Sequence, residues 1–388
     1  MKGVAVTGIG MLSNLGRGLT AHSDGLRRGV TALTPLSLFK TEGLDVRPVG
    51  EVADALLDGK SNYSRCQRLT LSAAKDALGG HHPTGEGIIA IGSTTGGIYE
   101  SEQHYLKHRG EEGVADRALL TNHPVGTIAD RLCRDLGLGG ERHTFATACS
   151  SSANSIGYAA ARVEAGAPWA LAGGVDSLCR LTWAGFHSLK LLSSTACRPF
   201  DLHRNGLSLG EAAAFLFLEP IAAARARGAT IFGLVSGWGC SADAYHMTAP
   251  HPEGLGAIAA MRAALADADC QPGHIDYVNA HGTATPANDK AEGLALRAVF
   301  GARVPPVSST KGVTGHSLGA AGALEAAISL LIIRDGFLPG NVGLSQVDPA
   351  IGFEPLGPAT AFATVSKVIS NSFGFGGNNT ALVLERAP

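Results

Sequence analysis

"HTFATACSSSANSIGYAAARVEAG", residues 143–166, contains the clearest change from a strand pattern to a helix pattern in this chain. An apolar run ends at Cys149, small residues follow, and a helical pattern rich in Ala and Ser leads to Gly166. A second stretch, "HSLGAAGALEAAISLLIIRDG" at 316–336, repeats this plan with His316 in place of the cysteine. Periodicity alone also fits two ordinary Ala-rich core helices. Because small residues let backbones approach closely, we expect the two helices to be buried against each other.

The rest of the chain alternates between short β-rich runs and Ala/Leu-rich helical stretches, which predicts an α/β fold. The predicted strands are 3–7, 87–92, 144–148, 169–173, 212–218, 231–237, 275–280, 307–309, 368–372 and 380–384. The predicted helices are 64–79, 149–165, 254–268, 286–300 and 316–334. The repeat indicates two related halves, which we place at residues 1–228 and 229–388.

The length, composition and net charge of the chain exclude several classes of protein. The chain has 388 residues, 45% of them hydrophobic, which is enough for a large core or two ordinary domains. A net charge of −2 gives no case for nucleic acid, and no apolar run is long enough to span a membrane. Seven scattered cysteines without a CxxC pair or metal-ligand spacing indicate a reduced, cytoplasmic protein with no metal site. The N-terminus is interpreted as a strand and a Gly turn, not as a signal peptide.

Cys149 lies at the N-terminus of a predicted helix. The positive end of a helix dipole and unpaired backbone N–H groups favour the thiolate, which is the nucleophilic form of cysteine. The alternative is a buried, inert cysteine.

Two histidines occupy similar positions. His281 follows an apolar run in "YVNAHGTATPANDKAE", in a turn before a helix, where α/β proteins present reactive side chains. His316 starts a predicted helix five residues after Lys311, and the helix dipole biases such an imidazole toward its neutral form. A satisfied core or surface histidine is the alternative at each position.

The Gly-rich turn in "ISNSFGFGGNNTALVL", residues 369–384, lies between two predicted strands. Its backbone N–H groups could form an oxyanion hole together with the N–H of Cys149. No helix follows the turn, so it is not a dinucleotide-binding fingerprint.

Together these motifs resemble the elongating β-ketoacyl-acyl-carrier-protein synthases of the thiolase superfamily. The resemblance rests on seven stretches in order along nearly the whole chain: "VAVTGIGMLSNLG", "TACSSSAN", "RPFDLHRNGLSLGEAA", "SADAYHMTAP", "VNAHGTATPANDKAE", "SSTKGVTGHSLGAAGALE" and "NSFGFGGNN". It implies a thiolase-like fold of two homologous βαβαβαββ halves in a five-layered αβαβα core, usually dimeric. The N-terminal half would carry Cys149, and the C-terminal half both histidines.

The resemblance also implies roles for individual residues. Cys149 would accept an acyl chain from acyl carrier protein, and His281 and His316 would promote decarboxylation of malonyl-carrier protein. The same comparison implies a supporting role for Lys311, a gate and oxyanion-hole N–H at Phe375, contacts to the pantetheine arm at Thr283 and Thr285, and supporting carboxylates at Asp289, Glu292 and Glu325. It implies no cofactor of the protein's own, because the phosphopantetheine arrives on the carrier protein.

The chain departs from the family at several places. Ala284 stands where the family often has Gly, and Thr95 in "GSTTGG" stands where elongating members often have a larger apolar residue or Gly at the acyl pocket. The segments around 50–85 and 105–125 are short. The stretch "GFHSLKLLSSTACRPF" resembles ketosynthases of specialised polyene pathways such as aryl polyenes.

Three other functions are testable against the residues. A degradative thiolase needs a second catalytic cysteine near the C-terminus, but the last cysteine is Cys270. A serine hydrolase elbow matches "GHSLG" at 315–319, but no histidine follows it. A non-catalytic chain-length-type partner subunit typically lacks the nucleophile, which is present here. These residues argue against a thiolase and a serine hydrolase, so the alternative function that we keep is the partner subunit. The expected assembly is a homodimer, or a heterodimer with such a subunit.

Carrier proteins are acidic, so basic side chains would steer their docking. Arg65 and Arg68 lie three residues apart on a predicted helix, on one face, and Arg204 is a similar candidate. A solvated helix face explains the same pattern.

Overall fold

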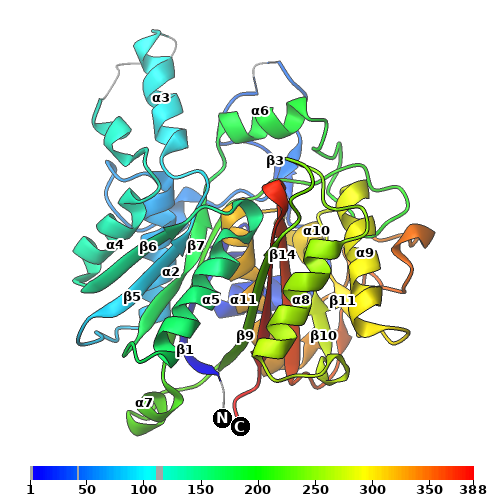
Figure 1. The fold of residues 1–388 in the computed structure, drawn as a ribbon. Helices are drawn as coiled ribbons and strands as arrows, with labels where there is room; N and C mark the ends of the chain where they lie inside the picture. Colours follow the sequence, from blue (N-terminus) through cyan, green and yellow to red (C-terminus); the bar gives the residue numbers. More distant parts are fainter. Residues whose placement is uncertain (1–2, 42, 111–116) are drawn as a thin grey trace.

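The computed structural model describes residues 3–41, 43–110 and 117–388. Residues 111–116, inside the segment that we expected to be shortened, lie outside this description. Figure 1 shows an α/β arrangement in which α5 and α11 lie at the centre, with strands on both sides of them. No helix in the described part of the chain is long and apolar enough to cross a membrane.

The main sheet has 11 strands within the described residues and runs in the order β11-β10-β14-β15-β9-β1-β8-β7-β5-β6, with β2 paired to β1. Its strands are β1 (Val4–Ser13), β2 (Gly16–Arg17), β5 (Gly87–Gly92), β6 (Gly140–Phe145), β7 (Ala170–Asp176), β8 (Ala212–Glu219), β9 (Gly233–Ala242), β10 (Tyr277–Asn279), β11 (Val307–Ser308), β14 (Lys367–Gly374) and β15 (Asn378–Glu385). The first and last parts of the chain meet where β1 pairs with β9 over only three residue pairs. Strands β1, β8, β7, β5 and β6 of the first part therefore lie on one side of this pairing, and β9, β15, β14, β10 and β11 of the last part lie on the other.

The short strands β3 (Thr34–Pro35) and β4 (Pro48–Val49) form one separate pair, and β12 (Phe337–Leu338) and β13 (Ala361–Phe362) form another. The α-helices are α1 (Leu19–Arg27), α2 (Arg65–Leu78), α3 (Ile98–His108), α4 (Thr127–Leu136), α5 (Ser151–Glu164), α6 (Arg180–Ser188), α7 (Ile221–Ala226), α8 (Leu255–Asp267), α9 (Pro286–Phe300), α10 (Lys311–Thr314) and α11 (Ala321–Asp335).

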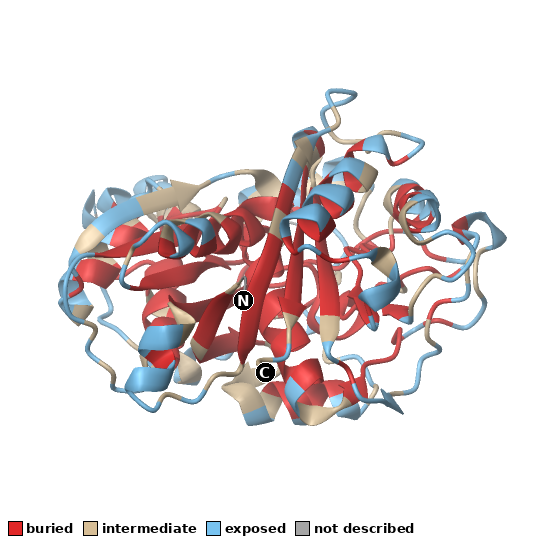
Figure 2. Cartoon of the chain, turned by 60° about the horizontal axis from the view of Figure 1, so that its bottom comes forward, coloured by how far each residue is buried: buried red, intermediate tan, exposed pale blue. Residues whose placement is uncertain are grey.

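Five layers result from this arrangement. Helix α2 covers β1 and β8 from outside, α5 and α11 fill the middle, and α8 covers β9 and β15 from the other side. Figure 2 shows the strands buried along most of their length, whereas the surface helices expose their outer faces. The thiolase-like layering expected from the sequence is thus present, although the division at residues 228 and 229 stays a prediction.

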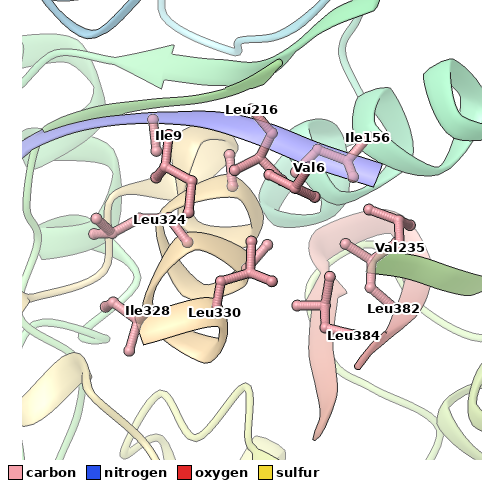
Figure 3. Close-up of a cluster of buried hydrophobic side chains, with 14 of the residues drawn as sticks. Val6, Ile9, Ile156, Leu216, Val235, Leu324, Ile328, Leu330, Leu382 and Leu384 are labelled. Atoms are coloured by element: carbon pink, nitrogen blue, oxygen red, sulfur yellow. The ribbon is translucent and has the colours of Figure 1, made fainter. Parts of the chain in front are cut away.

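The central core joins both runs of strands to the middle helices. Figure 3 shows Val6, Leu216, Val235 and Leu382 from four strands around Ile156 of α5 and side chains of α11 such as Leu324, Ile328 and Leu330. Helix α11 is buried on almost every side, which explains why its apolar residues do not keep to one stripe.

Close contact between the two middle helices confirms the expectation drawn from their small residues. The backbone N–H of Ala323 donates to Ser152 Oγ at 2.9 Å. A Cβ atom added at Gly322 would lie 2.7 Å from both the Cβ and the backbone N of Ala153. Larger side chains at these positions would force the helices apart.

Several predicted boundaries were wrong. Strand β6 ends at Phe145 rather than 148, because the chain leaves the sheet to form a tight turn in which Ala148 has φ 53°. Helix α11 begins at Ala321 rather than 316, since residues 315–320 form turns with positive φ at Gly315 and Leu318. Helices α1, α3, α4, α6, α7 and α10 were not predicted.

The packing of α11 on α5 predicts opposite effects of two Gly→Ala changes within helices. Gly322→Ala should lower the free energy of unfolding by about 1–3 kcal/mol, because the added methyl group meets the backbone of α5. Gly185→Ala, in α6 with open space around it, should raise that free energy by about 0.5–1 kcal/mol. Urea unfolding of both variants measures the difference, and equal effects would contradict the close packing.

Candidate active site

Cys149 lies in a short 3₁₀ turn, Ala148–Ser150, directly before α5. Hydrogen bonds of small polar residues hold this turn: Thr147 N donates to Ser151 Oγ at 2.9 Å, and Ser150 Oγ donates to Thr147 O at 2.8 Å. Gly374 packs so tightly against the turn that an added Cβ would lie 3.0 Å from Cys149 N. The small residues after Cys149 therefore allow the sharp change from strand to helix.

Backbone hydrogen bonds from other elements fix both histidines. His316 N donates to Ser208 O at 2.7 Å, and Gly210 N donates to His316 O at 2.9 Å. His281 follows β10, and its N–H donates to Glu292 Oε1 at 2.8 Å. Each histidine thus stands on a turn that is tied to a neighbouring segment.

The fold brings the three predicted reactive side chains together. His316 Nε2 lies 3.0 Å from Cys149 Sγ, and the rings of His281 and His316 have centroids 5.3 Å apart at an interplanar angle of 85°. All three side chains are buried and line one cavity of about 320 Å³. One thiol and two imidazoles can therefore act on the same bound group.

Both imidazoles are neutral at neutral pH. Burial lowers the pKa of His281 and of His316 well below the ordinary value, and the positive charge of Lys311 lowers both further. The neutral form expected for His316 is thus present, but burial causes it rather than a helix dipole, because α11 starts only at Ala321.

The prediction of a thiolate at Cys149 is wrong for the free protein. Burial raises the pKa of the Cys149 thiol to about 11. Lys311 and a hydrogen bond from the Phe375 N–H act in the opposite direction but do not offset the burial. The sulfur is therefore a protonated thiol beside a neutral imidazole.

Lys311 and Glu325 form a buried ion pair beside the histidines. Burial raises the pKa of Glu325 to about 6, and Lys311 limits this rise. The pair places the positive charge of Lys311 where it keeps both imidazoles neutral.

Two buried carboxylates hold the loop that carries His281. Glu292 accepts the N–H groups of His281 and Gly282, each at 2.8 Å. Asp289 accepts the N–H of Ala284 at 3.1 Å and that of Phe200 at 2.8 Å. Ala284 has φ 66°, a conformation that favours Gly, which fits the family's frequent Gly at this position.

Residues expected to contact the substrate also line the cavity. The hydroxyl oxygens of Thr283 and Thr285 lie 3.0 Å apart on its wall. Phe375 follows Gly374 at the wall, and its ring stacks on that of Phe186 at 5.5 Å between centroids. Thr95 is not among the described residues that line this cavity; its N–H and hydroxyl group donate to Asp176 instead.

The docking prediction is wrong for Arg65 and Arg204. Arg65 is buried and pairs with Glu211, at 2.5 Å between Nη2 and Oε1, and with Asp54. Arg204 is buried and pairs with Asp348 at 2.6 Å. Neither guanidinium group is exposed at the surface. Arg68 is half-buried, and its role stays a prediction.

An apolar wall of the cavity was not predicted from the sequence. It consists of Phe186, Leu189, Leu191, Leu207 and Phe373. Three of these residues, Phe186, Leu189 and Leu191, lie within the stretch that resembles polyene ketosynthases. No periodic pattern marks them, because they come from the end of α6 and the irregular chain after it.

Cysteine and histidine are also zinc ligands. Within the described residues, the ligand atoms of Cys149, His281 and His316 all lie within 4.8 Å of one another, so this group could hold a metal ion. The absence of a metal site stays a prediction.

Comparison with known proteins defines the class. Residues 1–224 match the family model of the beta-ketoacyl synthase N-terminal domain, and residues 232–345 match that of the C-terminal domain. The chain belongs to the β-ketoacyl synthase family.

Particular relatives resemble the chain over its whole length. It is 34% identical to 3-oxoacyl-[acyl-carrier-protein] synthase 2 of Staphylococcus aureus strain COL, over 99% of this chain and 98% of that protein. It is similar to the solved structure of the ishigamide ketosynthase/chain length factor, with 32% identity, a TM-score of 0.92 and full coverage of both chains. It is also similar to a ketosynthase, ApeO, in complex with its chain length factor, ApeC, from Xenorhabdus doucetiae, with 34% identity, a TM-score of 0.89 and coverage of 100% and 98%.

The raised pKa of Cys149 predicts a pH profile for its alkylation by iodoacetamide. The thiolate reacts, so the rate should rise about tenfold per pH unit from pH 7 to pH 10 without a plateau. Peptide mass spectrometry assigns the adduct to Cys149, with Cys149→Ala as the control. A plateau near pH 8 would contradict the buried neutral thiol.

Proposed function

We propose that the protein catalyses decarboxylative Claisen condensation: an acyl thioester held on Cys149 reacts with malonyl-acyl-carrier protein, and the chain grows by two carbons. The observation that carries this proposal is the placement of one thiol and two neutral imidazoles in a single buried cavity. Membership of the β-ketoacyl synthase family and the similarity to a 3-oxoacyl-[acyl-carrier-protein] synthase support it.

In the first step, Cys149 Sγ attacks the thioester carbonyl of the acyl-carrier protein. The S–H proton is within reach of His316 Nε2, which lies 3.0 Å away. The bond to the pantetheine sulfur breaks, and that sulfur takes the proton and leaves as a thiol. Covalent catalysis divides one difficult reaction into two easier ones.

In the second step, malonyl-carrier protein loses carbon dioxide. The electron pair of the broken C–C bond forms an enolate, whose oxygen accepts hydrogen bonds from His281 and His316. Neutral imidazoles suit this role, because they donate hydrogen bonds without trapping the enolate in an ion pair.

In the third step, the enolate carbon attacks the Cys149 thioester. The N–H of Phe375, which points toward Cys149 Sγ, and the N–H of Cys149 would stabilise the developing oxyanion. The C–S bond then breaks, its electron pair stays on the Cys149 sulfur, and this thiolate takes a proton from solvent water. Thr283 and Thr285 would contact the pantetheine arm of the carrier protein, which brings the only prosthetic group that the reaction needs.

We also propose that the chain acts as a dimer in the cytoplasm, with a second copy or with a homologous chain-length-type subunit. The two similar solved structures with a chain length factor favour the second assembly. The alternative, that this chain is itself such a non-catalytic partner, is weakened by the joint presence of Cys149, His281 and His316 in one cavity.

Three variants separate the proposed steps. Cys149→Ala should abolish condensation, because no acyl-enzyme can form. His281→Ala should retain acylation of Cys149, whereas His316→Ala should form the acyl-enzyme more slowly, because the S–H proton loses its nearby acceptor. Both variants should lower carbon dioxide release from malonyl-carrier protein about 10²-fold or more. Intact-protein mass spectrometry and a carbon dioxide assay measure the two steps separately. Condensation by Cys149→Ala at the wild-type rate would rule out the nucleophile.

A further inference from the structure

Asp176 is a buried carboxylate that the proposed reaction does not use. It ends strand β7, and its residue is 0% exposed. Burial raises its pKa, while a set of hydrogen bonds acts in the opposite direction and favours the ionised form. Burial of a carboxylate costs free energy unless hydrogen bonds compensate the charge. The donors around Asp176 therefore indicate its role.

Six donors converge on this carboxylate. Oδ1 accepts Ser93 Oγ and Thr95 Oγ1, each at 2.9 Å, and the N–H groups of Thr94 and Thr95, each at 2.8 Å. Oδ2 accepts Thr94 Oγ1 at 2.5 Å and Gly319 N at 2.7 Å. The N–H groups of Thr94, Thr95 and Gly319 can only donate, and the ionised carboxylate accepts all six groups at once, so the pattern favours the ionised form.

The donors come from two segments that are far apart in the sequence. Ser93, Thr94 and Thr95 form the loop after β5, whereas Gly319 lies in the 3₁₀ turn Leu318–Ala320. That turn starts two residues after His316. The carboxylate thus joins the loop after β5 to the segment that carries His316.

The contact at Gly319 leaves no room for a larger residue. A Cβ atom at residue 319 would lie 2.7 Å from Asp176 Oδ2 and 3.2 Å from Thr94 Cγ2. Leu318 has φ 50°, a conformation that a leucine adopts only when the surroundings impose it. The Asp176 carboxylate therefore fixes the position of the turn Leu318–Ala320. This turn follows His316 and determines the position of His316 relative to Cys149.

We infer that Asp176 is a positioning residue for His316, and that its ionised carboxylate acts through the N–H of Gly319 to hold the imidazole in place for decarboxylation. This inference rests on the proposed function, because it assigns a task to a residue that would touch neither substrate. A misplacement of about 1 Å can cost about 10²-fold in rate, so a support of this kind has a measurable effect.

The charge of Asp176 gives a second, independent signature. Its negative charge contributes to the raised pKa of the Cys149 thiol. Removal of the charge should make Cys149 easier to ionise. Entry of water into a loosened site would act in the same direction, so a variant that disturbs the turn but keeps the charge is the control for this readout.

The test compares three variants of the full chain. Asp176→Asn removes the charge and one acceptor for the Gly319 N–H. Gly319→Ala keeps the charge but pushes the turn away from the carboxylate. Asp201→Asn is the matched control, since Asp201 is also buried and accepts N–H groups, of Ser345, Gln346 and His203, but does not line the cavity.

We expect Asp176→Asn and Gly319→Ala each to lower kcat for carbon dioxide release about 10- to 100-fold with little change in KM. Alkylation of Cys149 at pH 8 should be faster in Asp176→Asn and unchanged in Gly319→Ala. Asp201→Asn should lower the thermal midpoint while folded protein keeps carbon dioxide release within about twofold of the wild type.

Wild-type carbon dioxide release by a folded Gly319→Ala variant would overturn the inference, and so would equal losses in Asp176→Asn and Asp201→Asn. If Asp176→Asn does not fold, Gly319→Ala decides alone. A wild-type protein that releases no carbon dioxide would instead contradict the proposed function, so the two failures are distinguishable.

Discussion

The contact between α5 and α11 is the constraint on which the rest of the structure depends. Gly322 and Ala153 meet with no room for another methyl group, and Ser152 accepts the N–H of Ala323 across the contact. Each helix starts just after a turn that presents a reactive side chain. Close approach of the two helices therefore brings Cys149 and His316 within 3.0 Å of each other, although 167 positions separate them in the sequence.

Burial of Cys149, His281 and His316 determines their protonation states. It keeps both imidazoles neutral and the thiol protonated, and it strengthens each hydrogen bond to a developing charge. Lys311 adds a positive charge that disfavours imidazolium, and Glu325 compensates that charge. The site is thus prepared to stabilise negative charge that appears only during the reaction.

Much of this arrangement could be predicted from the sequence, and the reasons are local. Strand and helix patterns gave the five helices of the predicted set to within a few residues at most ends, because their periodicity is strong. Cys149, His281 and His316 stand in turns beside small residues, which is a visible signal.

Arg65 and Arg204 were misjudged because their buried partners, Glu211 and Asp348, are remote in sequence. The pKa of Cys149 depends on burial, which no local pattern reports. Asp176 was missed because its six donors come from two distant segments.

The most direct test of the account is a single-turnover reaction followed by mass spectrometry. Cys149 is loaded from an acyl-carrier protein, the excess donor is removed, and malonyl-carrier protein is added. We predict loss of the acyl group from Cys149, a β-ketoacyl-carrier protein longer by two carbons, and one carbon dioxide per acyl group. An acyl-enzyme that forms at Cys149 but returns its acyl group unextended, or extension without any adduct at Cys149, would contradict it.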